Sequence, residues 1–241
     1  MVSHNWEAAA VVDGRTPNTA PPEKADADPS PAYEDVVAGP SRSSNAQPRL
    51  RILGATWGGV NVTAEISGMV GDDETISFNM HTLLLTLQPD PAPGIIKTLT
   101  VLYLYEDQGE IRLLNVPEFI PSISVKITPT THKEKVVCAQ PTYFSTLSDP
   151  AWTDGADGQV EIIAVLYGTK RIKNPSALQE LARFFEGRRG QIRTTTAFFG
   201  TDPWIGFRKS WTVYFRFASS RRIHCVTGMQ DGALEVPWTR S

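Results

Sequence analysis

A block of twelve residues occurs twice in this chain: residues 90–101 read DPAPGIIKTLTV, and residues 202–213 read DPWIGFRKSWTV. Asp, Pro, Gly, Lys, Thr and Val stand at matching positions in the two copies. The match continues upstream, where Trp57-Gly58 corresponds to Tyr167-Gly168. An internal repeat of this kind indicates two copies of one structural unit.

The repeated block is typical of a turn that leads into a strand. Asp-Pro favours an extended residue followed by a fixed φ, and Gly94 or Gly206 supplies a position where φ can be positive. Alternate residues of the following strand share one face. On that face every residue is large and apolar: Leu99, Val101, Tyr103 and Tyr105 in the first copy, and Trp211, Val213, Phe215 and Phe217 in the second. We therefore predict a half-buried strand in each copy.

Each predicted strand is followed by a hairpin. The loops at 106–109 and 218–221 have hairpin length. The strands after them carry Ile111 and Leu113, or Ile223 and Cys225, which we expect to point into the same core. Cys225 is then a core thiol rather than a nucleophile, and its neighbour His224 is expected on the solvent face.

Residues 174–187 interrupt the β pattern with the signals of an amphipathic helix. Asn174 is a capping residue, Pro175 stands at the first helical position, and Gly187 marks the end. Apolar residues at 178, 181, 182 and 185 fall on one side of this helix. The matching stretch of the first copy, residues 63–71, is shorter and rich in glycine, which favours a turn.

These patterns predict a mainly β chain of two tandem antiparallel repeats, each a small β-sandwich or half-barrel, with a short helix in the second. Repeat one is acidic and spans 49–146, a linker spans 147–158, and repeat two is basic and spans 159–241. Residues 1–48 hold seven of the 18 prolines and almost no large aliphatic residue, so we expect a disordered tail. Tyr33 follows Pro31 as in ligands of WW-type grooves, although Ser30 replaces the usual first proline; a solvated tail residue is the simpler interpretation.

Composition excludes several classes of protein. The chain has 241 residues, of which 41% are hydrophobic and 20% charged, so it is not wholly disordered. No apolar run approaches the roughly 18 residues of a membrane span. The first residues lack the pattern of a secretory signal, so we expect a cytoplasmic protein in which Cys138 and Cys225 stay thiols.

The opening ILGATWGGVNVT at residues 52–63, followed by the first repeated block, resembles an uncharacterised family of small β-rich domains in fungal proteins. It is also similar, more distantly, to the β-rich C-terminal region of mitochondrial DnaJ-type co-chaperones. The resemblance covers about 190 residues and implies a β-domain without assigned catalytic residues. The second copy lacks Val-Thr after Tyr167-Gly168. No His-Pro-Asp tripeptide of a J-domain is present, so chaperone recruitment is not implied.

Sequence motifs of catalysis and cofactor binding are missing, among them the phosphate-binding loop, the zinc-binding His-Glu-x-x-His and the nucleophile elbow. The histidines lack metal-ligand spacing; they are His4, His81, His132 and His224. A group of acidic residues does not follow the calcium-loop pattern and is interpreted as the linker with the start of repeat two, an irregular cation site being the alternative: Asp149, Asp154, Asp157 and Glu161. We predict no catalytic, metal-binding or cofactor-binding residues.

Charge separates the two halves of the chain. Residues 49–158 carry a net charge of −6, and residues 159–241 carry +7. Bases beside aromatic residues are able to bind nucleic acid or another polyanion. The candidate anion-binding or partner-binding residues are Arg188, Arg189, Trp204, Arg208, Lys209, Arg221 and Arg222. Two simpler interpretations stay open: repeat two docks on acidic repeat one, or its basic face is only solvated.

The sequence therefore favours a non-enzymatic binding or scaffold protein whose partner is a protein or a polyanion. Two alternatives stay open. One is an enzyme with its site between the repeats, because such interfaces often hold ligand pockets. Its carboxylates and bases would be Asp90 and Glu118 facing Arg208 or Lys209. The other is a carbohydrate-binding protein that uses an exposed Trp57 or Trp204.

Overall fold

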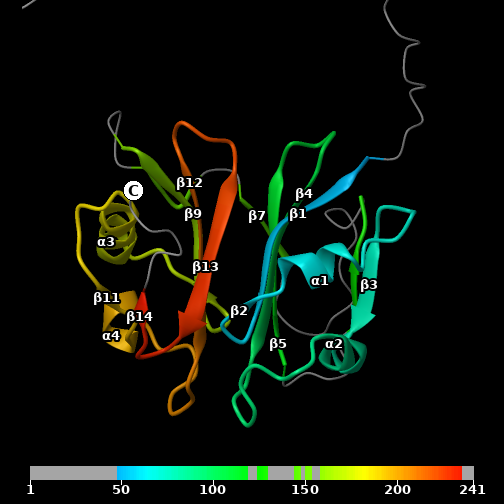
Figure 1. The fold of residues 1–241 in the computed structure, drawn as a ribbon, viewed down its shortest axis with the longest axis horizontal. Helices are drawn as coiled ribbons and strands as arrows, with labels where there is room; N and C mark the ends of the chain where they lie inside the picture. The colour runs from blue at the N-terminus through cyan, green and yellow to red at the C-terminus, as the bar shows by residue number, and fades with distance from the viewer. Residues whose placement is uncertain (1–47, 119–123, 130–143, 148–149, 154–157, 235–241) are drawn as a thin grey trace, which may run out of the picture. The chain divides into compact units, whose positions relative to one another are not determined.

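The computed structural model describes residues 48–118, 124–129, 144–147, 150–153 and 158–234, which belong to one compact unit (Figure 1). The tail through residue 47, with Tyr33, lies outside the described residues, as does Cys138. The helices are α1 (Thr63–Ser67), α2 (Met80–Thr86), α3 (Pro175–Phe185) and α4 (Thr196–Phe199). The strands up to the predicted linker are β1 (Leu50–Trp57), β2 (Val60–Asn61), β3 (Ile76–Asn79), β4 (Thr98–Tyr105), β5 (Ile111–Pro117), β6 (Ser124–Ile127) and β7 (Phe144–Leu147). The remaining strands are β8 (Trp152–Thr153), β9 (Val160–Tyr167), β10 (Lys170–Arg171), β11 (Ile192–Arg193), β12 (Ser210–Phe217), β13 (Ile223–Met229) and β14 (Ala233–Leu234).

The chain is mainly β, as the sequence predicts, and its strand pairs are antiparallel. One large sheet has the order β2-β1-β4-β5-β7, and the other has the order β10-β9-β12-β13, with β8 also paired to β9. Two ribbons, β3–β6 and β11–β14, complete the strand pairing. β8 falls inside the predicted linker, so part of that segment belongs to the second sheet.

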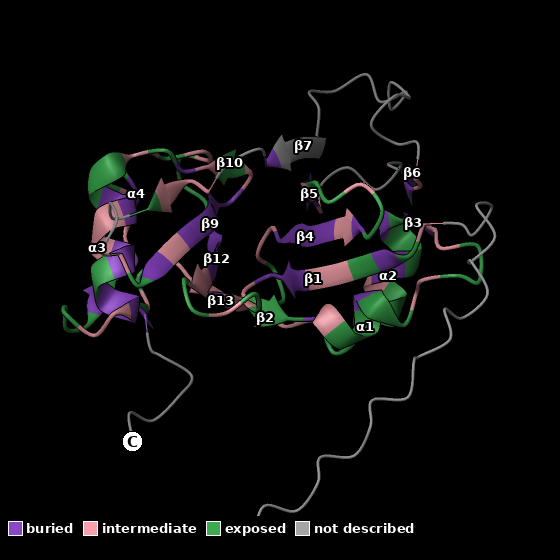
Figure 2. Ribbon diagram, turned by 90° about the horizontal axis from the view of Figure 1, so that it is seen from above, coloured by how far each residue is buried: buried purple, intermediate pink, exposed green. Residues whose placement is uncertain are grey.

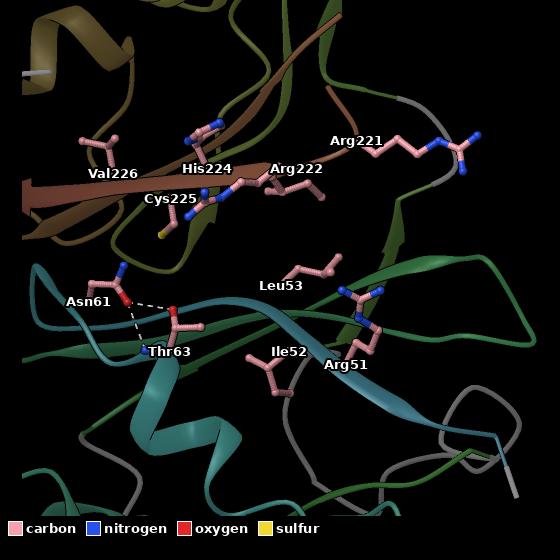
Figure 3. A pocket seen from close by; sticks show the side chains of 11 residues that line it. Arg51, Ile52, Leu53, Asn61, Thr63, Arg221, Arg222, His224, Cys225 and Val226 are labelled. Atoms are coloured by element: carbon pink, nitrogen blue, oxygen red, sulfur yellow. Dashed lines mark hydrogen bonds between the residues drawn. The ribbon is translucent and has the colours of Figure 1, made fainter. Parts of the chain in front are cut away.

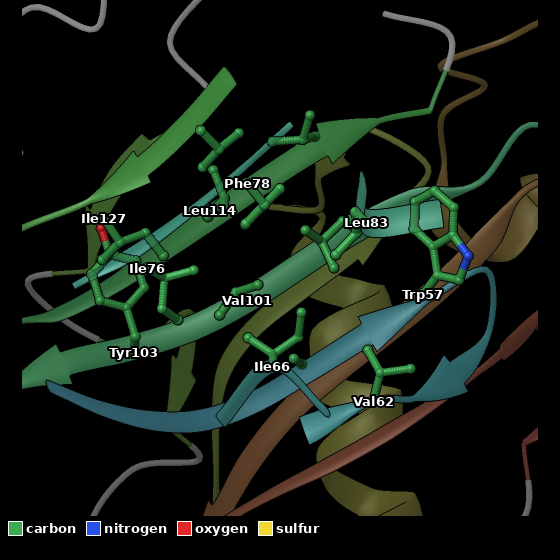
Figure 4. Close-up of a cluster of buried hydrophobic side chains, with 14 of the residues drawn as sticks. Trp57, Val62, Ile66, Ile76, Phe78, Leu83, Val101, Tyr103, Leu114 and Ile127 are labelled. Atoms are coloured by element: carbon green, nitrogen blue, oxygen red, sulfur yellow. The ribbon is translucent and has the colours of Figure 1, made fainter. Parts of the chain in front are cut away.

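Each large sheet buries both of its faces. The first sheet packs one face on α1, α2 and the β3–β6 ribbon (Figure 4), and the second packs one face on α3, α4 and the β11–β14 ribbon. The other two faces meet each other through an apolar cluster that includes Leu102, Ile163 and Tyr214. The prediction of half-buried strands is therefore wrong for the central strands β4 and β12, which are buried along nearly their whole length. Figure 2 shows the same burial along β4 and β9.

The predicted core face of the two central strands is confirmed. Leu99, Val101, Tyr103 and Tyr105 lie in the first core cluster, and Trp211, Val213 and Phe215 lie in the second, with Phe217 packed against it. The prediction for the following strands is wrong. Ile111, Leu113, Ile223 and Cys225 belong to the cluster between the large sheets. The cause is hairpin register: Val101 stands opposite Leu114 and Val213 opposite Val226, and residues opposite one another share a face.

The predicted helix is confirmed as α3. The side chain of Asn174 accepts a hydrogen bond from Ser176 N–H, Pro175 opens the helix, and Gly187 follows it with φ +80°. The stretch expected to be a turn contains a short helix, α1. Within the described ranges, every helix falls short of the length and apolar character needed to cross a lipid bilayer.

The repeated lysine closes the turn before each central strand. Gly94 and Gly206 have φ +75° and +82°, as predicted. Lys97 is 2% exposed, and its Nζ lies 3.1 Å from Asp90 Oδ2 and 5.8 Å from the ring centroid of Trp57. Lys209 is 1% exposed, and its Nζ lies 2.7 Å from Asp202 Oδ1 and 5.7 Å from the ring centroid of Tyr167. The block therefore recurs because its Asp and Lys hold the turn together.

Candidate functional site

A cleft opens between β1 of the first sheet and β13 of the second (Figure 3). The sheets approach closely where Thr56 Oγ1 lies 2.8 Å from Thr212 Oγ1. Tyr214 packs so near β1 that a Cβ on Gly54 would lie 2.8 Å from its ring, so glycine is needed there. Toward residues 51 and 221 the two strands diverge (Figures 1 and 3). The packing of the sheets thus creates the cleft.

The cleft has a volume of about 600 Å³, which is within the usual ~300–1,000 Å³ of ligand pockets. The first half of the chain contributes Arg51, Ile52, Leu53, Asn61 and Thr63, and the second contributes Arg221, Arg222, Ile223, His224, Cys225 and Val226. Arg51 and Asn61 come from one wall and Arg222 and Cys225 from the other, with Leu53 between them (Figure 3). None of the described residues that line the cleft is acidic.

Three arginines give the cleft its positive charge. Arg51 forms an exposed ion pair with Glu106 at 3.5 Å, and such a pair contributes little to stability, about 0–1 kcal/mol. Arg221 and Arg222 are exposed in the hairpin loop before β13 and form no ion pair with any described residue. Two of the three guanidinium groups therefore have no anionic partner within the described part of the chain.

Asn61 adds a neutral donor to the cleft. Its Oδ1 accepts hydrogen bonds from Thr63 N–H at 3.0 Å and from Thr63 Oγ1 at 2.7 Å. These two bonds fix the orientation of the amide, because an NH2 group cannot accept them. The Nδ2 of Asn61 consequently faces away from Thr63, toward the opposite wall (Figure 3). The arginines and Asn61 therefore offer only hydrogen-bond donors to a ligand.

Cys225 points into the cleft but is a poor nucleophile. Burial raises the pKa of its thiol from 9.0 to about 12, although a hydrogen bond with Tyr214 opposes that rise. A thiol with this pKa is protonated near neutral pH, and only the thiolate attacks electrophiles. Cys225 is therefore a core thiol, as predicted, but the core to which it belongs lies between the two large sheets.

We expect Cys225 to resist alkylation in the folded protein. In a Cys138→Ser background at pH 8, a pKa of about 12 in place of 9.0 makes the thiolate fraction about a thousandfold smaller. Iodoacetamide labelling followed by mass spectrometry should therefore be slow until guanidinium unfolds the chain. Because folding raises this pKa, the thiol's contribution to stability is complete below pH 9 and is lost as the pH rises toward 12. Rapid labelling of the folded chain would contradict the assignment.

The prediction that His224 lies on the solvent face is wrong. Its ring stacks on Phe215 at 5.2 Å between centroids and meets Phe217 edge-on at 5.5 Å. Burial, and then the charge of Arg222, lower the pKa of His224 below its ordinary value. The imidazole is therefore neutral at physiological pH and packs as an aromatic side chain, so the charge of the cleft comes from its arginines.

The predicted anion-binding residues do not form one patch. Arg221 and Arg222 lie at the cleft, whereas Arg188 and Arg189 follow α3 and pair with Glu186 and Glu180. Exposed Arg208 donates to the main-chain oxygen of Gln230, and half-buried Trp204 lies in the same loop. Lys209 is buried against Asp202 and so presents no exposed charge.

The residues expected to serve an enzyme site or a sugar-binding site are not placed for those roles. Asp90 and Glu118 both bind the ammonium of Lys97 in their own half of the chain. Trp57 is 1% exposed, so it offers no surface to a sugar. Each of the nine ion pairs between described residues joins groups of the same half, and the contact between the large sheets is largely apolar.

Metal binding has no support in the described ranges, where no three His, Cys, Asp or Glu side chains are grouped closely enough to hold an ion. Of the acidic group at and after the predicted linker, Glu161 lies in β9 and pairs with Arg216. Asp149, Asp154 and Asp157 lie outside the described residues.

Sequence reasoning missed Arg51, Asn61 and Thr63. Arg51 belongs to the acidic half, so the net charge of that half concealed it. Asn61-Val62-Thr63 matches a glycosylation acceptor formally, but the same spacing is also that of an Asx turn, in which Asn bonds the main chain two residues on. That second interpretation would have indicated an ordered amide at the start of α1.

No family model, curated protein or solved structure matches this chain. The resemblance to small fungal β-domains and to the C-terminal region of DnaJ-type co-chaperones stays a prediction.

Proposed function

We propose that this chain is a non-enzymatic binding protein of two tandem β repeats, and that the cleft between β1 and β13 holds an anionic ligand. The observation that carries the proposal is the lining of the cleft: three arginines and the amide of Asn61 face it, and none of the described residues contributes a carboxylate to it. Guanidinium groups present paired donors that match the oxygens of carboxylates, phosphates and sulfates.

The two sheets support the tandem-repeat part of the proposal. The order β2-β1-β4-β5 in one sheet corresponds to β10-β9-β12-β13 in the other. In both halves a helix follows the short second strand, and a short strand with a second helix precedes the repeated block. β6 and β14 then pair with β3 and β11 in the same way.

A binding role has more support than catalysis. The contact between the large sheets is filled by apolar side chains, and the ionisable groups among the described residues of this cluster are Tyr214 and Cys225, whose raised pKa values keep them protonated. General acid–base chemistry near neutral pH needs a group that titrates there. The planar guanidinium groups of the arginines present several hydrogen-bond donors at once and so suit binding of an oxyanion.

Reversing two of the arginines should abolish most of the affinity for an anion. We expect Arg221→Glu/Arg222→Glu to weaken binding of a fluorescent heparin octasaccharide at least tenfold, because tenfold corresponds to only about 1.4 kcal/mol. Fluorescence anisotropy on the full chain at low salt measures the Kd, and added salt should weaken binding by the wild type.

Arg188→Glu/Arg189→Glu is the matched control. It changes the net charge by the same amount at two consecutive arginines that do not line the cleft. We expect its Kd to stay within about threefold of the wild-type value, since distant exposed charges are screened. Equal losses in the two variants would mean that only net charge matters, and the cleft would not be the site.

A further inference from the structure

We infer that the anion held by the cleft is a short acidic segment of another protein, bound as an extended strand along the free edge of β13. This inference rests on the proposed function and specifies the chemistry of its ligand. To the arginines that carry the general proposal it adds two features: the main-chain groups at the edge of β13, and the apolar side chains that lie between the arginines.

The ladder between β12 and β13 shows which main-chain groups of β13 turn outward. Gln230 N–H donates to the main-chain oxygen of Lys209 at 2.8 Å, directly beyond the pair formed by Ser210 and Met229. Hydrogen-bonded and non-hydrogen-bonded pairs alternate along an antiparallel ladder. His224, Val226 and Gly228 therefore bond to β12, and Ile223, Cys225 and Thr227 direct their N–H and C=O groups to the opposite edge.

That edge is available beside the cleft. β13 is the last strand of its sheet and pairs only with β12 among the described strands. Residues 221–226, which include the first half of β13, line the cleft. An unpaired strand edge binds an extended peptide through main-chain hydrogen bonds, and neighbouring side chains then select its sequence.

Charge complementarity determines what kind of peptide fits. Arg221 and Arg222 stand at the start of β13, and Arg51 comes from the facing wall. Leu53, Ile223 and Cys225 form an apolar surface between them. Because the side chains of a strand alternate, the two acidic residues directly next to a central aliphatic residue place their carboxylates on the side opposite the aliphatic group. About five residues match the length from Arg222 to Val226, all of which line the cleft.

A nucleic-acid strand fits these residues less well. Proteins that bind single strands use exposed aromatic rings on which the bases stack. Within the described part of the chain, no Trp, Tyr or Phe lines the cleft, and the ring of His224 already stacks on Phe215. The arginines alone would hold phosphates, but they leave the main-chain edge without a role.

The test uses the full chain and a labelled peptide, acetyl-Glu-Glu-Val-Glu-Glu-amide. Two N-methylated versions keep its charge and block either the odd or the even amides. A peptide that joins a sheet uses only one of its edges, so one methylation pattern should weaken binding at least tenfold and the other by less than threefold. If both versions bind as tightly as the parent, strand addition is disproved, although the anion-binding cleft stands.

A variant of the protein provides a second measurement. Ile223→Pro removes an outward N–H without taking a hydrogen bond from β12, a position where an edge strand tolerates proline. We expect this variant to weaken binding of the peptide at least tenfold and binding of heparin by less than threefold. Ile223→Ala, which keeps the N–H, should weaken binding of the peptide by less than threefold. If Ile223→Pro fails to fold, the methylated peptides decide the question with the unmodified chain.

The remaining outcomes separate this inference from the proposed function. Binding of heparin or of a thymidine octanucleotide without binding of the peptide would overturn the peptide inference and leave the anion-binding function in place. Absence of binding to all three probes at low salt would overturn both. Peptide binding that is lost in Arg221→Glu/Arg222→Glu and kept in Arg188→Glu/Arg189→Glu supports both.

Discussion

Replacing Lys97 with methionine should lower the free energy of unfolding by about 3 kcal/mol, near the lower end of the range for breaking a buried ion pair. The Nζ of Lys97 lies 3.1 Å from Asp90 and 3.0 Å from Glu118, and it donates to the carbonyls of Ala92 and Ile95. Methionine fills the space but leaves all four groups without this donor. The two carboxylates are 32% and 22% exposed, so water compensates part of the loss.

Urea unfolding followed by circular dichroism measures this effect, with Lys126→Met as the control. Lys126 is exposed on β6, and its replacement should change the free energy of unfolding by less than about 0.5 kcal/mol. Lys209→Met should cost less than Lys97→Met, because Lys209 has one carboxylate partner and Lys97 has two. A loss at Lys97 no larger than that at Lys126 would show that the lysine does not hold the turn.

The effect of Lys97→Met should also depend on pH. Burial raises the pKa of Asp90, but hydrogen bonds from Ala92 N–H and Lys97 outweigh it, and the net pKa lies below 3.8. A carboxyl whose folded pKa is lowered stabilises the fold above its unfolded pKa and loses that contribution as the pH falls through the folded value. The difference between wild type and Lys97→Met should therefore shrink below about pH 4.

Local patterns in the sequence were enough to predict the turns and the longest helix. Gly94 and Gly206 have the positive φ that the block requires, and Asn174 caps α3 as expected. Each of these features depends on residues within a few positions of one another, so the chemistry of the local chain decides them. The α2 helix was missed although Asn79 and Thr82 form a capping box that marks its start.

The packing of the two sheets could not be predicted in the same way. Period-two alternation identifies one buried face, but β4 also buries Thr98, Thr100 and Leu102 on its second face. When a strand is buried on both faces, no solvent side marks which face is which. The sequence then does not show which of the two cores the side chains of the next strand enter. The expectation for Ile111 and Ile223 failed for this reason.

The candidate site depends on the same long-range packing. Arg51 is separated from Arg221 and Arg222 by most of the folded chain, and the two groups come from halves of opposite net charge. Summing charge over each half therefore indicated attraction between the halves rather than a shared basic cleft. The apolar cluster between the sheets brings these arginines together, and nothing local to either segment encodes that contact.

Tyr214 is the side chain on which this contact depends most. It is fully buried in the cluster between the sheets, and its hydroxyl lies 3.3 Å from the main-chain oxygen of Gly54 and 3.4 Å from that of Thr100. We expect Tyr214→Ala to lower the free energy of unfolding by about 3–5 kcal/mol, since it removes a buried ring and leaves a cavity. Tyr214→Phe should cost only about 0.5–1.5 kcal/mol, because it removes just the hydroxyl.

Hydrogen exchange followed by mass spectrometry tests whether Tyr214 joins the two sheets or only fills its own. Its ring extends from β12 to β1, so Tyr214→Ala should raise amide exchange in β4 of the first sheet as well as in β12 of the second. The cleft between β1 and β13 depends on the same contact, so the variant should also bind the heparin octasaccharide more weakly. Faster exchange confined to β12, with β4 unchanged, would mean that the first sheet is stable without its partner and that the arginines are held in place by other contacts.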